Sequence, residues 1–204
     1  MYTLNKTVFH GSNCEVKRGD FSKSRDDIDF GVGFYTTEDE RMAKKWACSR
    51  VVSVLNEYSI NMKGLSVYTF GLDEEWLLYI KANRNQDEGS DEIIDKYSSY
   101  DILIGPTADD KMFDTIQLYL DGYITADQAV KYLNIAGYSE QIVLKTEAAL
   151  DACRFVSSKI IEKGEKVRFK QMAKDDRLEA NRKLDELMKK EEKITRRNNG
   201  FKKD

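Results

Sequence analysis

Short apolar runs alternate with short amphipathic ones along most of the chain. Runs rich in β-branched and aromatic residues predict strands over residues 2–10, 30–37, 51–62, 65–70, 100–105, 140–145 and 155–161. Apolar residues at helical spacing predict helices after Thr37 and over residues 73–83, 111–120, 125–133 and 146–151. Polar residues predict loops over 13–29 and 85–91. Because the strands and helices interleave without regular βαβ spacing, the pattern predicts a compact α+β domain.

Two of the predicted helices have recognisable starts. Thr37 stands where a helix N-cap is expected, and residues 38–40 are acidic, as the helix dipole favours in a first turn. The apolar face of this helix would carry Met42, Ala43, Trp46 and Ala47. Residues 125–128 (TADQ) form a capping-box pattern for a later helix.

The pattern changes beyond Gly164. Residues 168–195 are charged almost throughout, and their few apolar positions form a thin helical seam that is too weak to predict a coiled coil. We therefore expect one domain over residues 1–162 and a charged helical segment over residues 163–204, disordered from Arg196 onward.

Charge is unevenly distributed between these two parts. The net charge of the chain is −3, but residues 163–204 carry 15 basic and 9 acidic side chains, which leaves −9 on the remainder. We expect the basic segment to be a solvated helix resting on the acidic body, and the alternatives are a helix for partner binding or self-association and a nucleic-acid-binding arm. Hydrophobic residues make up 41% of the chain, which is enough for a core.

No feature indicates secretion, a membrane or a metal. No apolar run approaches the roughly 20 residues of a membrane-spanning helix, and residues 1–8 lack the layout of a signal peptide. Cys14, Cys48 and Cys153 are widely separated, which fits neither a disulfide framework nor a zinc site. These observations predict a cytoplasmic protein with no membrane partner and no bound metal.

Three short motifs carry the candidate chemistry. The first is His10-Gly11-Ser12, at the end of a predicted strand and containing the only histidine of the chain. The second is the strand Gly31-Val32-Gly33-Phe34-Tyr35, followed by two threonines, and the third is the strand Glu140-Gln141-Ile142-Val143-Leu144. Gly31 and Gly33 do not form a dinucleotide fingerprint, because no third glycine follows at the required spacing.

Taken in this order, the motifs resemble the histidine–tyrosine–glutamate clade of ADP-ribosyltransferases, which includes poly-ADP-ribose polymerases and diphtheria toxin. Residues 10–155 resemble more closely a family of small bacterial proteins that is labelled a domain of unknown function. That family is marked by HGS, DFG-x-GFY-x-T, IGP-x-ADD and a Gln-led strand ending in Lys-Thr-Glu, and each of these segments is present. The resemblance implies split antiparallel sheets with short flanking helices, and NAD as the substrate.

The resemblance also implies roles in NAD binding. His10 would bond the ribose hydroxyls on the nicotinamide side, because a neutral imidazole offers one donor and one acceptor. Tyr35 would stack on the nicotinamide ring, and the backbone of Gly11 would pair with the nicotinamide carboxamide. Ser12 would contact the adenosine side, and Gly33 belongs to the nucleotide-binding strand.

Further residues are needed to bind the NAD diphosphate and to act as a general base toward the acceptor. Arg25 lies in a predicted loop where its guanidinium could hold the diphosphate, although a solvated surface charge is the alternative. Asp109 and Asp110 follow the strand ending at Pro106 and could serve as a general base, or could cap the helix that follows.

The third motif leaves two candidates for the group that orients the ribose. Glu140 matches the catalytic glutamate of the polymerases by simple overlay, whereas Gln141 matches the closer bacterial family. Adjacent strand residues face opposite sides, so only one of the two can point into the site. We favour Gln141, which lacks the charge to stabilise a developing cation and therefore favours single ADP-ribose transfer over polymer synthesis.

The function implied is that of an NAD-dependent mono-ADP-ribosyltransferase acting on a protein or nucleic acid, as a toxin of a toxin–antitoxin or phage-defence system. The alternatives are an NAD glycohydrolase, an inactive module that binds NAD or ADP-ribose, and an RNA 2′-phosphotransferase. The expected partners are NAD, the acceptor and an antitoxin, with self-association through the C-terminal helix as a further possibility.

Overall fold

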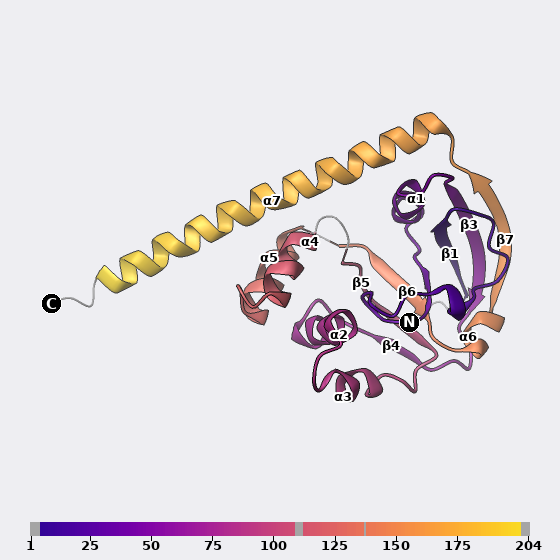
Figure 1. Ribbon diagram of the computed structural model, residues 1–204, viewed down its shortest axis with the longest axis horizontal. Coiled ribbons are helices and arrows are strands. Elements are labelled where there is room, and N and C mark those ends of the chain that lie inside the picture. Colours follow the sequence, from indigo (N-terminus) through magenta and orange to yellow (C-terminus); the bar gives the residue numbers. More distant parts are fainter. Residues whose placement is uncertain (1–4, 109–111, 137, 201–204) are drawn as a thin grey trace.

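A computed structural model describes residues 5–108, 112–136 and 138–200. Within these residues the chain forms seven strands in two sheets and seven α-helices, so the predicted α+β class is confirmed. Figure 1 shows helices on both sides of the sheets and one long C-terminal helix that runs along the body and projects beyond it. None of the helices in this part of the chain combines the length and the apolar character that crossing a membrane requires.

The first sheet has the order β1-β3-β7 and is antiparallel throughout. It contains β1 (Asn5–Ser12), β3 (Val54–Asn61) and β7 (Cys153–Ile160). The β1 strand therefore brings the His10 motif to one edge of this sheet, paired on its inner side with β3.

The second sheet has the order β2-β6-β5-β4. It contains β2 (Phe34–Thr36), β6 (Glu140–Leu144), β5 (Ile102–Pro106) and β4 (Val67–Thr69). The β4–β5 pair is parallel, which corrects the expectation of antiparallel sheets alone. Helices α2 and α3 connect these two strands, and a crossover of that kind permits parallel pairing.

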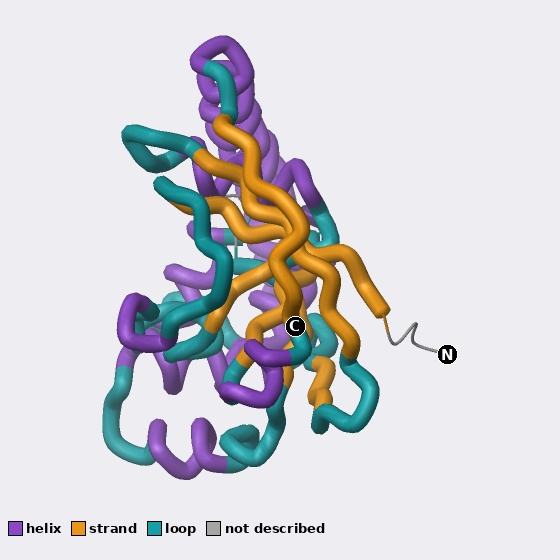
Figure 2. The backbone as a smooth tube through the Cα atoms, turned by 90° about the vertical axis from the view of Figure 1, so that its right-hand side faces the viewer, coloured by secondary structure: helices purple, strands orange, loops and turns teal. Residues whose placement is uncertain are grey.

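The two sheets meet edge to edge and also share a core. A single bridge between Phe9 and Thr37 joins the outer edges of β1 and β2, and Figure 2 shows the strands crossing the centre of the molecule. Val8 and Tyr58 of the first sheet pack against Phe34 and Ile142 of the second in a common apolar cluster. The bridge and this cluster hold the sheets together, so the three sequence motifs converge near the bridge.

A second apolar cluster covers the opposite face of the second sheet. Leu103 and Val143 point into it because they alternate with the residues of the shared core. The helices that enclose it are α2 (Glu74–Asn85), α3 (Ser90–Asp95), α4 (Phe113–Leu120) and α5 (Ala126–Ala136). Helix α1 (Glu40–Cys48) packs instead on β1 and β3, while α6 (Glu147–Asp151) precedes β7.

The C-terminal helix, α7 (Lys163–Gly200), contacts α1, α4 and α5. Phe169 and Leu184 are buried along it, while Leu178 is 68% exposed. The helix spans most of the segment over which a charged helix is expected and continues to Gly200.

Local boundaries differ from the sequence prediction at two other places. The strand expected over residues 30–37 is reduced to Phe34–Thr36, because Gly31 has a φ of +63° and turns the preceding backbone. The loop expected over residues 85–91 contains the start of α3, which follows Gly89 at a φ of +86°. The capping box at Thr125 is confirmed, since Gln128 and Thr125 exchange side-chain to backbone hydrogen bonds.

Candidate functional site

Thr37 connects the elements that carry the three motifs. Its backbone exchanges two hydrogen bonds with Phe9 of β1, at 3.0 and 2.8 Å. Its buried hydroxyl donates to the carbonyl of Glu140 on β6, at 2.7 Å, and accepts from the amide of Asp39, at 3.1 Å. The prediction that Thr37 caps α1 is wrong, because the carboxylate of Asp39 accepts from the first free amides of that helix.

His10 lies where β1 and β2 diverge beyond the bridge. Its Nδ1 is 2.7 Å from the carbonyl oxygen of Tyr35, and its ring centroid is 4.7 Å from that of Phe34. A carbonyl can only accept, so Nδ1 carries the proton. Burial lowers the pKa of His10, with a smaller contribution from the charge of Arg50 that the hydrogen bond to Tyr35 opposes. The neutral ring therefore presents Nε2 as an acceptor, and no described residue bonds this atom.

Gly11 and Ser12 have local structural roles. A Cβ atom on Gly11 would lie 1.9 Å from the carbonyl oxygen of Ala43, so glycine allows α1 to pack closely on β1. The Ser12 hydroxyl is turned to its own loop, where it accepts from the amide of Cys14 at 3.0 Å and donates to the carbonyl of Cys14 at 2.8 Å. Their side-chain requirements are thus explained by packing and by the turn.

Tyr35 points to the face of β2 opposite Phe34, against the helix-covered core. Its hydroxyl donates to the carbonyl of Gly31 at 2.7 Å and accepts from the amide of Phe30 at 3.0 Å. Burial raises the pKa of this phenol, which keeps it protonated as the donor. A Cβ on Gly33 would lie 2.5 Å from the Val143 side chain, so Gly33 lets β2 pack on β6.

Gln141 and Glu140 face opposite sides of β6. The Gln141 side chain is on the Tyr35 side, is 1% exposed, and donates to Asp29 Oδ2 at 3.3 Å and to the carbonyl of Pro106 at 3.2 Å. Glu140 is exposed on the other side. The sequence-predicted residues are therefore divided, with Tyr35 and Gln141 on one face and His10 and Glu140 toward the other.

Asp29 organises the buried side of the site. Its Oδ1 accepts from Nε of Arg84 at 3.1 Å and from Nη2 of the same guanidinium, while its Oδ2 also accepts from the amide of Ala108 at 3.2 Å. Arg84 was not identified from the sequence, because a single arginine directly after a predicted helix carries no distinguishing pattern. The ion pair joins α2, the loop after β5, and β6 through Gln141.

Lys145 holds the turn between Asp29 and Phe34 from the other end of β6. Its Nζ donates to the carbonyl of Phe30 at 2.5 Å and to that of Val32. Burial lowers the pKa of Lys145 to about 8. The turn is therefore fixed by Lys145, by the Tyr35 hydroxyl and by Asp29.

The remaining predicted residues are Arg25, Asp109 and Asp110. Arg25 is exposed, and its guanidinium lies 3.3 Å from the carboxylate of Asp27. Asp109 and Asp110 lie outside the described residues.

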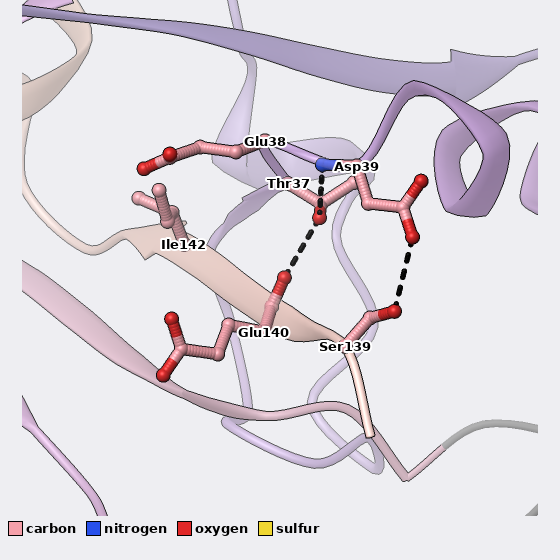
Figure 3. A pocket seen from close by; sticks show the side chains of 6 residues that line it. All are labelled: Thr37, Glu38, Asp39, Ser139, Glu140 and Ile142. Carbon is pink, nitrogen blue, oxygen red and sulfur yellow. Dashed lines mark hydrogen bonds between the residues drawn. The ribbon is translucent and has the colours of Figure 1, made fainter. Parts of the chain in front are cut away.

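A small pocket opens beside Glu140 (Figure 3). It has a volume of about 170 Å³ and is lined by Thr37, Glu38, Asp39, Ser139, Glu140 and Ile142. The Ser139 hydroxyl crosses it to Asp39 Oδ2 at 3.0 Å, and Glu38 also pairs with Lys6. Figure 3 shows the carboxylates of Glu38 and Glu140 extending on the same side of the pocket. Carboxylates at this position can stabilise a cationic group.

Comparison with known proteins gives a family. Searches of the curated proteins and of the solved structures find no match to the chain. One family model matches residues 6–155, the part that contains all three motifs. The chain therefore belongs to the family described as proteins of unknown function DUF3990.

Proposed function

We propose that the chain binds NAD where β1, β2 and β6 meet, and that it breaks the nicotinamide–ribose bond to transfer one ADP-ribose to a macromolecule. The observation that carries this proposal is the state of His10. Because Nδ1 donates to Tyr35, Nε2 is a fixed acceptor for a ribose hydroxyl. Thr37 joins β1, the strand of His10, to the backbone carbonyl of Glu140. The side-chain carboxylate of Glu140 lines the pocket.

In this proposal Glu140 takes the role for which the sequence favoured Gln141. The amide of Gln141 is buried and already donates to Asp29 and Pro106. The carboxylate of Glu140 can accept from the ribose 2′-hydroxyl, and its charge can stabilise the oxocarbenium-like transition state. Gln141 is then a positioning residue that fixes β6.

The proposed step balances as a substitution at C1′ of the ribose. The bond between C1′ and the nicotinamide nitrogen breaks, and its electron pair leaves with neutral nicotinamide. A nucleophile of the acceptor forms the new bond to C1′ and releases its proton to a carboxylate or to water. Tyr35 contributes through its carbonyl, which holds His10, and through its hydroxyl, which anchors the preceding turn.

A toxin of a toxin–antitoxin or phage-defence system is suggested by resemblance to ADP-ribosyltransferases that modify macromolecules. Transfer to a protein or nucleic acid is therefore the outcome to test first.

The test uses the full chain with NAD carrying one label on the adenylate phosphate and another on nicotinamide. We expect release of nicotinamide together with transfer of the phosphate label to macromolecules in a bacterial lysate. Release without transfer would identify a glycohydrolase, and NAD binding without release would identify a binding module. Glu140→Gln should abolish release, whereas Glu147→Gln, at an exposed carboxylate that pairs with Arg18 and does not line the pocket, is the control. Absence of both binding and release would overturn the proposal.

A further inference from the structure

Two consecutive residues of α7 bind two different helices. Asp176 pairs with Lys45 of α1. Arg177 pairs with Asp114 of α4, with Nη2–Oδ1 at 2.5 Å and Nε–Oδ2 at 3.1 Å, and its guanidinium lies 4.9 Å from the ring centroid of Phe113. Figure 1 shows α7 running past α1 and on toward α4 and α5. The helix therefore joins elements that belong to different sides of the molecule.

Two of the helices that α7 contacts, α1 and α5, lie next to the two walls of the pocket along the chain. One wall, Thr37–Asp39, leads into α1. The other, Ser139–Glu140, follows α5, which packs against α4 and also contacts α7. Inside the pocket the walls are linked by the hydrogen bonds from Thr37 to Glu140 and from Ser139 to Asp39. Outside the pocket, α7 contacts α1 and α5 and so connects the two walls a third time.

Ion pairs and a small apolar contact attach α7. Lys44 pairs with Glu165 at 2.8 Å, and the side chains of Lys44 and Lys45 are only 15% and 12% exposed. Phe169, packed against α1 together with the partly buried Met172, and Leu184 are the apolar anchors. Ion pairs near a protein surface contribute little each, and salt screens exposed pairs more than partly buried ones. The Arg177–Asp114 pair, with side chains 46% and 28% exposed, is more open to screening than the pairs at α1. Attachment of this kind holds a helix in place but allows its release.

We propose that α7 is an ionic strap that sets the position of the two pocket walls, so that its release loosens the pocket. The Asp176–Lys45 and Arg177–Asp114 pairs fasten the strap at α1 and at α4, and the Lys44–Glu165 pair is a second ionic contact at α1. The inference rests on the contacts of α7 alone and does not require that NAD is the ligand. It predicts that access to the pocket depends on ionic strength and on anything that binds α7.

Hydrogen–deuterium exchange of the full chain tests the strap. At low salt, Lys45→Glu should accelerate exchange about fivefold in peptides covering residues 37–39 and 139–141. The exchanged pair Lys45→Glu/Asp176→Lys should restore protection, and the wild type at about 1 M salt should resemble Lys45→Glu. Arg182→Glu is the matched control, because Arg182 pairs with Glu179 and Glu186 of α7 itself.

Two results would overturn the inference. Faster exchange within α7 but not in the pocket peptides would show that α7 is an appendage. Failure of the exchanged pair to restore protection would show that the contact does not act through charge. If Lys45→Glu does not fold, Arg177→Gln tests the other fastening by the same measurement. Because no readout involves NAD, this outcome is independent of the proposed reaction.

Discussion

The side-chain hydroxyl of Thr37 donates a hydrogen bond to the main-chain carbonyl of Glu140, at 2.7 Å, although the two residues are 103 positions apart. The carbonyl lies at the first residue of β6, where the strand emerges beside the pocket. Since Thr37 also pairs through its backbone with Phe9, one buried residue sets the relative positions of β1, β2 and β6. The geometry of the candidate site therefore depends on a threonine that contacts no ligand in the proposal.

Thr37→Val removes this hydroxyl while keeping the shape of the side chain. We expect a loss of about 1–3 kcal/mol in the free energy of unfolding, because the Asp39 amide and the Glu140 carbonyl lose a buried partner. Thr146→Val is the control, since the Thr146 hydroxyl, beyond the other end of β6, donates to Asp101 Oδ1 at 2.6 Å and accepts from the amide of Ala149 at 3.3 Å. Both variants should lower stability in denaturant titrations, but only Thr37→Val should weaken NAD binding. Equal binding by the two variants would contradict the role given to Thr37.

Glu140 and Gln141 should respond to substitution in opposite ways. Glu140 is exposed, so Glu140→Gln should change stability by less than about 0.5 kcal/mol while reducing nicotinamide release roughly 100-fold or more. Gln141 is buried and hydrogen-bonded, so Gln141→Leu should cost about 1–3 kcal/mol of stability by leaving Asp29 and Pro106 without its donor. Thermal unfolding and a nicotinamide assay on both variants check this. A stable, inactive Gln141→Leu would return the catalytic role to Gln141.

The sequence predicted most elements because local patterns determine them. The Thr125–Gln128 capping box and the apolar run of β5 are such patterns, and both are found in the structure. Gly31 could not be interpreted in the same way. Its positive φ shortens β2, and a glycine within an aromatic strand pattern does not reveal its dihedral angle.

For a similar reason, the sequence could not show which face of the sheet each site residue occupies. Strand alternation shows that Glu140 and Gln141 point to opposite sides, but not which side is covered by helices. That depends on α2, which brings Arg84 to Asp29 and so creates a buried partner for Gln141. The ion pair between residues 55 positions apart has no local signature.

His10 should make folding sensitive to acid. Burial lowers its pKa in the folded state below the usual value near 6.5, so the unfolded chain binds more protons between these two pKa values. The contribution of His10 is thus fully present above about pH 6.5 and is lost as the pH falls below it. His10→Gln keeps a donor for the Tyr35 carbonyl but cannot titrate.

The wild type and His10→Gln contain the same carboxylates, so the difference between their free energies of unfolding from about pH 5 to 7 reports His10 alone. The wild type should lose more stability than His10→Gln in chemical unfolding. Because the chain has one histidine, its imidazole resonance also reports the pKa directly. A resonance that titrates at or above 6.5 would contradict the buried, neutral state on which the NAD proposal depends.

Lys145 should have the opposite consequence, visible at alkaline pH. Its pKa is lowered by burial to about 8, from an ordinary value near 10.5, so the folded protein releases this proton before the unfolded chain does. The contribution of Lys145 to stability should therefore rise between about pH 8 and 10, by about 2 kcal/mol. Burial raises the pKa of Cys153 to about 12, and earlier ionisation of this thiol in the unfolded chain acts in the opposite direction, so the contribution is read as the difference between the wild type and Lys145→Met. The neutral amine still has two N–H groups, enough to keep its bonds to the carbonyls of Phe30 and Val32.

Lys145→Met should abolish the rise, whereas Lys159→Met, on exposed β7, should keep it. Measurements must stop near pH 10, because burial raises the pKa of Tyr79 to about 12 and ionisation of such tyrosines then opposes folding. A difference in stability between the wild type and Lys145→Met that stays constant from pH 8 to 10 would mean that Lys145 is not held as a buried cation over the turn before β2.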